Sequence, residues 1–429
     1  MKQGCARDSK WVEELVRAHV QKLPLFADGP IGVGDNAELA KSVESVHIAG
    51  LADAMKRRAR AKNPTKIMSS EDPVSYTKEE QLAFWNATLD IHVYRLYDEE
   101  GVEAGIADPE NGEDDTPSCM TWLLPASDFQ GLWESLEYDA DVKAGLMDYA
   151  TSAMYLASCG VDSKIIAWNR LFLLHGPPGT GKTSLCKALA QRLSVILGRK
   201  YTSAVLIEID AHSLFSKWFS ESGKLVSRLF DKILAMAEDP DCLVCVLIDE
   251  VESLTAARKS SLSGSEPSDA LRVVNAVLTK LDTLRRKPNT LTMTTSNVTG
   301  AIDDAFLDRA DIKQHIGTPS LGPRYKILRS GTVELMRTGI VRPFIELHHA
   351  LGAWTTSPTG SQVDQQSLAL FNVAQEAVGL SGRTLRKLPL LAHALHLNAT
   401  SAKVSCEQYL AALLSAVRTE QKDKKDIET

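Results

Sequence analysis

A glycine-rich segment carries the strongest chemical signal in the sequence. It reads Gly176-Pro-Pro-Gly-Thr-Gly-Lys-Thr183 and fits the pattern G-x-x-x-x-G-K-[ST]. Such glycines let backbone N–H groups turn inward around phosphate oxygens, and a following helix presents its positive end to the same anion. In this loop the lysine neutralises β- and γ-phosphate charge, and the threonine hydroxyl binds Mg²⁺. The residues predicted to bind the nucleotide are Gly176, Pro177, Pro178, Gly179, Thr180, Gly181, Lys182 and Thr183.

Two carboxylates follow the apolar run 243–248, which has the length of a buried strand. Asp249 and Glu250 would then lie at the carboxyl end of a parallel strand, where ligands bind in open α/β sheets. Asp249 is suited to hold Mg²⁺ through its water shell, and Glu250 to orient and polarise an attacking water. Together with the phosphate loop, they predict hydrolysis of a nucleoside triphosphate.

Three further polar residues lie near expected element ends. Asn297 follows a third apolar run, and its amide can donate to the γ-phosphate or the water, although such residues also simply terminate strands. Arg309 and Arg383 can each stabilise the charge that develops on the γ-phosphate. Such an arginine acts in the site of its own subunit (in cis) or of a neighbouring one (in trans). For either arginine alone, a surface ion pair is the alternative.

A polar segment between the first two motifs places two aromatic residues side by side. Trp218 and Phe219 follow Lys217, with a glycine nearby. Core residues usually recur at helix or strand spacing, so adjacent aromatics here favour a loop that grips a ligand. Burial under the neighbouring helix is the alternative.

The elements that must position these residues alternate between strands and helices. Strands are predicted at 171–174, 205–209, 243–248 and 290–295, and helices near 182–197, 222–237 and 268–286. This alternation is typical of an α/β fold with a parallel sheet covered on both faces. Later helices are predicted near 321–337, 367–377, 381–398 and 406–419. They indicate a small helical C-terminal domain.

The N-terminal part has a different character. Helical patterns at 11–23 and 78–84 mix with alternation at 45–48 and 91–97, which indicates a small α+β domain. The stretch 98–118 is acidic and lacks Lys and Arg, so we expect a flexible linker; an acidic docking site is the alternative. The expected division is an N-terminal domain 1–97, a linker 98–120, a large ATPase subdomain 121–318 and a lid 319–429.

Composition excludes several classes of protein. The 429 residues are 44% apolar and 24% charged, which is typical of a soluble globular protein. Lys and Arg number 48 against 55 Asp and Glu, and a net charge of −7 argues against direct nucleic-acid binding. We find no apolar run of membrane-spanning length and no signal peptide, so we expect no membrane partner. Seven cysteines fit a reducing compartment, and Cys242 and Cys245 would face opposite sides of one strand rather than share a metal.

The landmarks, in this order, resemble an AAA+ ATPase over residues 120–429. Five longer segments resemble the pachytene checkpoint protein 2 family: Trp168–Ala190, His212–Lys224, Leu247–Arg258, Asp308–Gln314 and Leu380–Pro389. The resemblance implies a P-loop AAA+ module with a helical lid and an α+β N-terminal domain. It implies ATP and Mg²⁺ as cofactors.

The same resemblance implies a function and roles for single residues. It implies a homohexamer that threads the N-terminal part of HORMA-domain proteins through a pore, with a closed HORMA adaptor, in meiotic recombination and spindle-checkpoint disassembly. It further implies a nuclear, chromosomal and also cytoplasmic location. Glu250 would activate water, and the segment 131–136 would pack near the adenine. Asn297 resembles sensor 1, Arg383 sensor 2, Arg309 the finger that reaches the neighbouring subunit, and Lys217, Trp218 and Phe219 the pore loop.

Two other functions remain open from the sequence. An AAA+ enzyme of this kind could sever or unfold a different target, such as a polymer or a degradation substrate. Alternatively, ATP could merely lock a conformation in a loader or scaffold. In both cases the nucleotide site would be the same.

Overall fold

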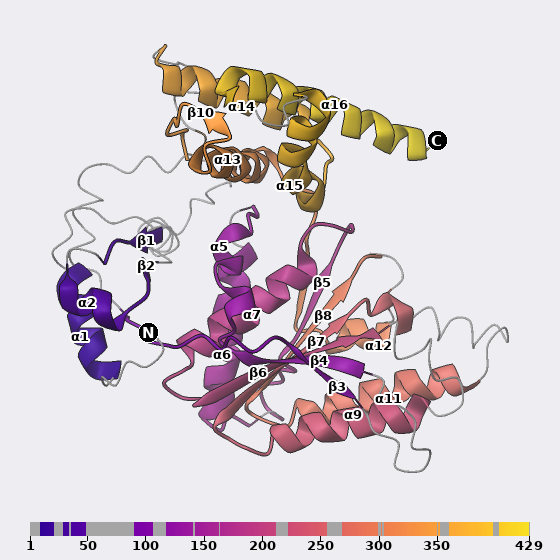
Figure 1. Ribbon diagram of the computed structural model, residues 1–429. Coiled ribbons are helices and arrows are strands. Elements are labelled where there is room, and N and C mark those ends of the chain that lie inside the picture. The colour runs from indigo at the N-terminus through magenta and orange to yellow at the C-terminus, as the bar shows by residue number, and fades with distance from the viewer. Residues whose placement is uncertain are drawn as a thin grey trace, which may run out of the picture.

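A seven-stranded sheet forms the centre of the molecule (Figure 1). The computed structural model describes residues 9–20, 29–33, 36–48, 90–105, 117–139, 142–162, 164–211, 222–254, 268–298, 302, 304–349, 351, 360–397 and 403–428. The strand order is β3 (Val102–Gly105), β4 (Pro117–Leu124), β6 (Ser203–Asp210), β7 (Cys242–Asp249), β8 (Thr290–Ser296), β5 (Leu171–His175) and β9 (Ile312–His315). From β6 to β9 all neighbours are parallel, which confirms the predicted α/β sheet.

Each face of the sheet is covered by helices. On one face, α9 (Ser222–Met236) and α11 (Ser268–Leu284) form a hydrophobic core with Val244, Val246 and Ile248 of β7. On the other, α6 (Val142–Ser158) and α7 (Lys182–Ile196) pack against the alternate β7 residues, such as Leu247. Each buried aliphatic side chain contributes roughly 1.5–3 kcal/mol. The strand β7 is therefore held from both sides.

The two cysteines of β7 behave as predicted. Cys242 belongs to the core beneath α9 and α11, whereas Cys245 belongs to the core on the α7 face. Both are buried and free. Residues three apart on a strand point to opposite faces, so the pair cannot bind one metal.

The prediction of a linker over 98–120 was wrong for part of that range. Residues 102–105 form β3 and residues 117–124 form β4, which pair antiparallel with each other, and β4 also pairs with β6. Trp122 and Leu124 of β4 are buried in the sheet core. β3 is the edge strand, which needs only one partner. β4 is an inner strand without acidic residues, and the acidic average of the whole stretch hid it. The predicted strand 91–97 was also wrong, since its described residues make only an isolated bridge from Tyr97 to Ala126.

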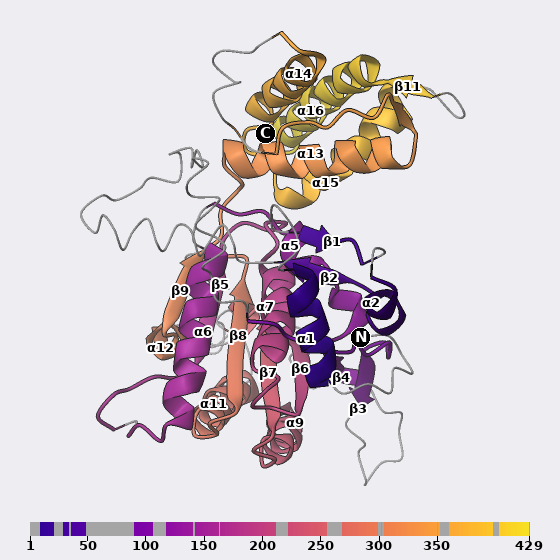
Figure 2. The same cartoon turned by 90° about the vertical axis from the view of Figure 1, so that its left-hand side faces the viewer.

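The C-terminal helices form a separate layer above one end of the sheet (Figure 2). They are α13 (Leu321–Arg337), α14 (Gln362–Glu376), α15 (Gly382–Leu391), a π-helical turn (Ala392–His396) and α16 (Cys406–Glu428). Two short parallel strands, β10 (Val341–Arg342) and β11 (Val404–Ser405), join them. These elements share their own hydrophobic core, so the predicted helical lid is present.

The N-terminal elements pack into a small core of their own. Helix α1 (Ser9–Val20), β1 (Gly29–Ile31), α2 (Ala37–Ser42) and β2 (Val46–Ile48) gather Val12, Val16 and Leu39. The predicted helix at 11–23 and strand at 45–48 therefore correspond to α1 and β2, while the predicted helix at 78–84 lies outside the described residues. Among the described helices, none is both long and apolar enough for a membrane span.

A buried arginine connects β5 to the end of α11. Arg170 is 3% exposed and adopts a left-handed backbone conformation with φ +54°. Its guanidinium donates to three backbone carbonyls, those of Thr290, Arg285 and Lys287. Burial lowers the pKa of this guanidinium, although it stays charged.

We expect Arg170→Leu to lower the free energy of unfolding by about 3 kcal/mol, because it removes the charge-assisted hydrogen bonds from a buried guanidinium to three carbonyls. Urea unfolding followed by circular dichroism measures this. Arg199→Leu is the matched control, because Arg199 pairs with Asp90 and Glu13 at the surface and its loss should cost under about 1 kcal/mol. Equal losses in the two variants would contradict the assigned role of Arg170.

Candidate nucleotide-hydrolysis site

The glycine-rich loop runs from the end of β5 into α7, as its sequence pattern requires. Gly176, Gly179 and Gly181 have φ angles of +142°, +76° and +90°. A Cβ atom on Gly176 would lie 2.2 Å from the backbone oxygen of Ile316. Only glycine fits there, because any side chain would displace the backbone of Ile316, the residue that follows β9. The loop therefore exposes its backbone at the amino end of α7, where an anion is favoured.

Lys182 lies folded against this loop. Its Nζ donates to the carbonyls of Gly176 and Pro177, both at 2.9 Å, and the residue is 4% exposed. Burial lowers the pKa of the ammonium, and the carboxylates of Glu252, Asp249 and Glu250 oppose that shift. Phosphate oxygens bound here can accept the two hydrogen bonds that Lys182 donates to the carbonyls. Their negative charge would also stabilise the buried ammonium.

A threonine and an aspartate that are far apart in sequence meet beside the loop. Thr183 Oγ1 lies 3.1 Å and 3.0 Å from the two carboxylate oxygens of Asp249. Thr295 of β8 also donates its hydroxyl to Asp249. The donor set is all oxygen, which suits a hard divalent cation. Among the described residues no three His, Cys, Asp or Glu side chains form a metal cluster. Thr183 and Asp249 would hold Mg²⁺ together with phosphate oxygens and waters.

Glu250 occupies a strained position next to Asp249. Its φ of +58° is in the left-handed region, which a non-glycine residue adopts at a cost of about 1–3 kcal/mol. Its backbone N–H points to Thr295 Oγ1 at 3.4 Å, and its side chain is exposed to the site. Asn297 Nδ2 lies 3.5 Å from Glu250 Oε1. The structure thus brings together the two residues that the sequence predicts to handle the attacking water.

The lid contacts the phosphate loop directly. The backbone N–H of Arg383 donates to the carbonyl of Gly179 at 2.9 Å. Ser381 caps the start of α15 by accepting from the N–H of Thr384, and its Oγ would lie 2.8 Å from a Cβ on Gly179. Arg383 therefore stands in the first turn of α15 beside the predicted phosphate position.

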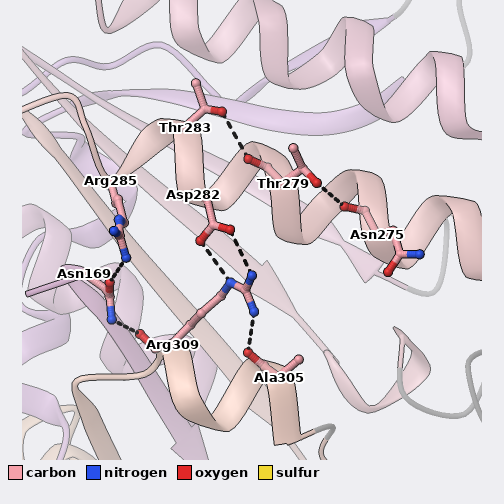
Figure 3. A network of polar contacts seen from close by, with 8 residues as sticks. All are labelled: Asn169, Asn275, Thr279, Asp282, Thr283, Arg285, Ala305 and Arg309. Atoms are coloured by element: carbon pink, nitrogen blue, oxygen red, sulfur yellow. Dashed lines mark hydrogen bonds and ion pairs between the residues drawn. The ribbon is translucent and has the colours of Figure 1, made fainter.

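Arg309 lies in a different environment (Figure 3). Its guanidinium makes two hydrogen bonds to Asp282 of α11, at 3.0 and 2.8 Å, and one to the carbonyl of Ala305. These bonds lower the pKa of the Asp282 carboxyl. The ion pair, which was the alternative for a lone arginine, is thus present in the single chain. A role of Arg309 in a neighbouring subunit stays a prediction.

Two other predicted features fare differently. The predicted pore-loop residues Lys217, Trp218 and Phe219 lie outside the described residues. The segment 131–136 contains α5 (Leu132–Ser135), and Arg386 of the lid donates to the carbonyl of Ser135. Nearby, the hydroxyl of Tyr138 donates to the carbonyl of Gly181 at 3.0 Å. The segment 131–136 therefore contacts the lid, and Tyr138 just after it contacts the loop, while the place of the segment near the adenine stays a prediction.

Three site residues escaped the sequence analysis: Tyr138, Glu252 and Thr295. Glu252 accepts a hydrogen bond from the backbone N–H of Asn297 at 3.0 Å. Thr295 lies in the same polar strand end as Asn297, so strand alternation could have flagged it. For Glu252 and Tyr138 the sequence holds no comparable signal, because their partners lie 45 and 43 residues away.

Comparisons with known proteins match this geometry. Residues 172–318 match the model of the ATPase family associated with various cellular activities, and residues 320–421 match that of a TRIP13-like AAA+ ATPase lid C-terminal domain. The pachytene checkpoint protein 2 homolog of Xenopus tropicalis is 45% identical over 416 residues, or 96% of this chain and 90% of that protein. The Mus musculus homolog is 46% identical over 396 residues, or 92% and 85%.

Two solved structures have a similar fold. The structure of C. elegans PCH-2 matches with a TM-score of 0.62 and 39% identity, covering 77% of this chain and 78% of that one. The structure of an E. coli MS115-1 HORMA:CdnC:Trip13 complex matches with a TM-score of 0.51 and 17% identity, covering 68% and 93%. At 17% identity the second similarity concerns the fold alone.

We expect Thr295→Val to reduce the turnover number for ATP by 10- to 100-fold. The substitution keeps the branched shape but removes the hydroxyl that donates to the Asp249 carboxylate and accepts from the Glu250 backbone N–H. Asp249 then keeps its contact with Thr183 but loses this second restraint, and the strained Glu250 backbone loses an acceptor. Steady-state release of phosphate measures the change.

Thr294→Val is the matched control for this variant. Thr294 points to the opposite face and donates to the carbonyl of Phe172 at 2.8 Å. Its loss should cost about 1 kcal/mol of stability and leave turnover unchanged. If Thr295→Val hydrolysed ATP at the wild-type rate, the described anchoring of the carboxylates would be wrong.

Proposed function

Because this chain belongs to the pachytene checkpoint protein 2 family of AAA+ ATPases, we propose that it uses ATP hydrolysis to remodel HORMA-domain proteins. Membership in this family makes the chain an ATP hydrolase. The observation that supports the chemistry is the meeting of Thr183, Asp249, Glu250 and Asn297 around one phosphate loop. The partner class is suggested by the name of a solved relative with the same fold, which assembles with a HORMA protein.

The chemistry follows from the positions of these side chains. Lys182 exchanges its carbonyl partners for phosphate oxygens. Mg²⁺, held through Thr183 and Asp249, would screen the negative charge of the phosphates. Glu250 accepts a proton from a water whose oxygen bonds to the γ-phosphorus as the bond to the β-γ bridging oxygen breaks, which yields ADP and phosphate. The amide of Asn297 orients the water beside that carboxylate.

The lid supplies a route from chemistry to motion. Arg383 belongs to the helix whose backbone binds Gly179, so a change of the loop on hydrolysis pulls on α15 directly. The side chain of Arg383 compensates charge on the γ-phosphate. When the phosphate leaves, this attraction is lost and the lid is free to rotate.

In this proposal six subunits form a ring, and Arg309 of each completes the site of its neighbour. Lys217, Trp218 and Phe219 line the pore and grip the N-terminal segment of a HORMA protein presented by a closed HORMA adaptor. The resulting pull converts the closed form into the open form. We place this activity on chromosomes in the nucleus, in meiotic recombination and axis control, and in the cytoplasm, where spindle-checkpoint complexes are taken apart.

The first test compares wild type with Glu250→Gln. The variant loses the proton acceptor but keeps its shape, so we expect ATP binding without hydrolysis and at least a 100-fold fall in turnover. Conversion of a closed HORMA protein with its adaptor to the open form should stop in parallel. If wild type hydrolyses ATP but leaves every HORMA substrate closed, the remodelling proposal fails while the ATPase stands. If Glu250→Gln opens the substrate by binding ATP alone, a conformational lock replaces threading.

A mixing experiment tests whether Arg309 acts in trans. Arg309→Ala and Glu250→Gln should each be inactive alone. A ring that contains both variants has interfaces where an intact Glu250 faces an intact Arg309 of the next subunit, so mixing should restore part of the hydrolysis. As a control for folding, each of the two variants should melt at the wild-type temperature. Absence of rescue in verified mixed rings would mean that Arg309 acts within its own chain or only through Asp282.

A further inference from the structure

A second glutamate lies close to the hydrolytic residues, and its negative charge favours the charged form of Lys182. Glu252 is two residues after Glu250, at the start of the helical residues 252–254 that follow β7. Its Oε1 accepts a hydrogen bond of 3.0 Å from the backbone N–H of Asn297. The bond joins the ends of two neighbouring strands, β7 and β8, across 45 residues of sequence.

The other oxygen of this carboxylate is buried and lacks a partner. Glu252 Oε2 makes no hydrogen bond within the described structure. A buried acceptor without a donor is unfavourable, because nothing replaces the hydrogen bond that water gave it. An apolar side chain would avoid this cost, so stability of the fold does not explain a carboxylate at this position. What the carboxylate does contribute is the hydrogen bond to the Asn297 backbone.

The position of the Asn297 backbone controls where its amide points. Three other bonds join the same strand ends, and all act on Thr295: its carbonyl accepts from the Val251 N–H at 3.0 Å, its Oγ1 accepts from the Glu250 N–H at 3.4 Å, and its hydroxyl donates to Asp249. The bond from Glu252 reaches residue 297 itself, one residue beyond β8. The carbonyl of the same peptide, that of Ser296, accepts from the Gly176 N–H at 3.2 Å, so Glu252 and the phosphate loop hold this peptide from both sides.

We propose that Glu252 is a positioning residue for ATP hydrolysis: by accepting the Asn297 N–H, it holds the Asn297 amide beside the Glu250 carboxylate. A displacement of about 1 Å at such a site lowers rates by up to about 100-fold. The inference rests on the proposed role of Asn297 in orienting the water. It assigns Glu252 no contact with the nucleotide.

Three variants separate the hydrogen bond from the charge. Glu252→Gln keeps an acceptor oxygen and loses the charge, so turnover should stay within about threefold of wild type. Glu252→Leu removes the acceptor and should lower turnover by 10- to 100-fold. The dissociation constant for a fluorescent ATP analogue should stay within about threefold in both. Glu252→Asp withdraws the oxygen by one methylene; it should lower turnover by at least tenfold, and it replaces the leucine variant if that protein does not fold.

A double-mutant cycle with Asn297→Ala tests the route of the effect. If Glu252 acts through the Asn297 amide, adding Glu252→Leu to Asn297→Ala should change turnover by less than about twofold. Multiplying losses would overturn the proposal, as would a Gln variant that is as slow as the Leu variant. If Asn297→Ala alone turned over at the wild-type rate, the role of Asn297 would fail first, and with it the inference about Glu252.

Discussion

The parallel register of three central strands is the constraint on which the site depends. Pairing aligns Ile248 with Thr294 and Leu174 with Thr295, so the ends of β7, β8 and β5 lie at one edge of the sheet. All residues of β7 except the terminal Asp249 are buried, on both faces. A shift of one residue would move every β7 side chain from one packed core into the other, so the fit of the side chains within both cores holds the register. The same register therefore fixes the positions of Asp249, the last residue of β7, and of Glu250, which follows it.

The site itself carries several local costs that this frame offsets. Glu250 has a left-handed backbone, Lys182 is a buried ammonium, and Glu252 has a buried oxygen with no hydrogen-bond partner among the described residues. None of these features favours folding, and together they cost several kcal/mol. Two continuous cores on either side of the sheet provide the surplus. Strain gathered at one edge of a stable sheet is typical of an active site, where geometry matters more than local stability.

Control of the reaction depends on contacts that lie outside this frame. The lid reaches the phosphate loop through one backbone hydrogen bond from Arg383, and Arg309 is engaged by Asp282 rather than by the loop of its own chain. The Arg309–Asp282 pair is bidentate, so the proposed role of Arg309 in a neighbouring subunit requires this pair to be broken first. The hydrolytic residues are thus brought together within one chain, whereas Arg309 is not among them.

The sequence by itself determined the phosphate loop, the strand that ends in Asp249 and Glu250, and the helical lid. Those features depend on spacing within single segments, which composition and periodicity report directly. Tertiary structure alone decided that β4 joins the sheet, that Arg309 pairs with Asp282, and that Glu252 binds Asn297. Arg309 and Asp282 are 27 positions apart, and Glu252 and Asn297 are 45 positions apart. The paired residues of β4 and β6 lie still farther apart in the sequence. No local pattern encodes them, because a partner is chosen by the packing of whole elements rather than by its neighbours in the chain.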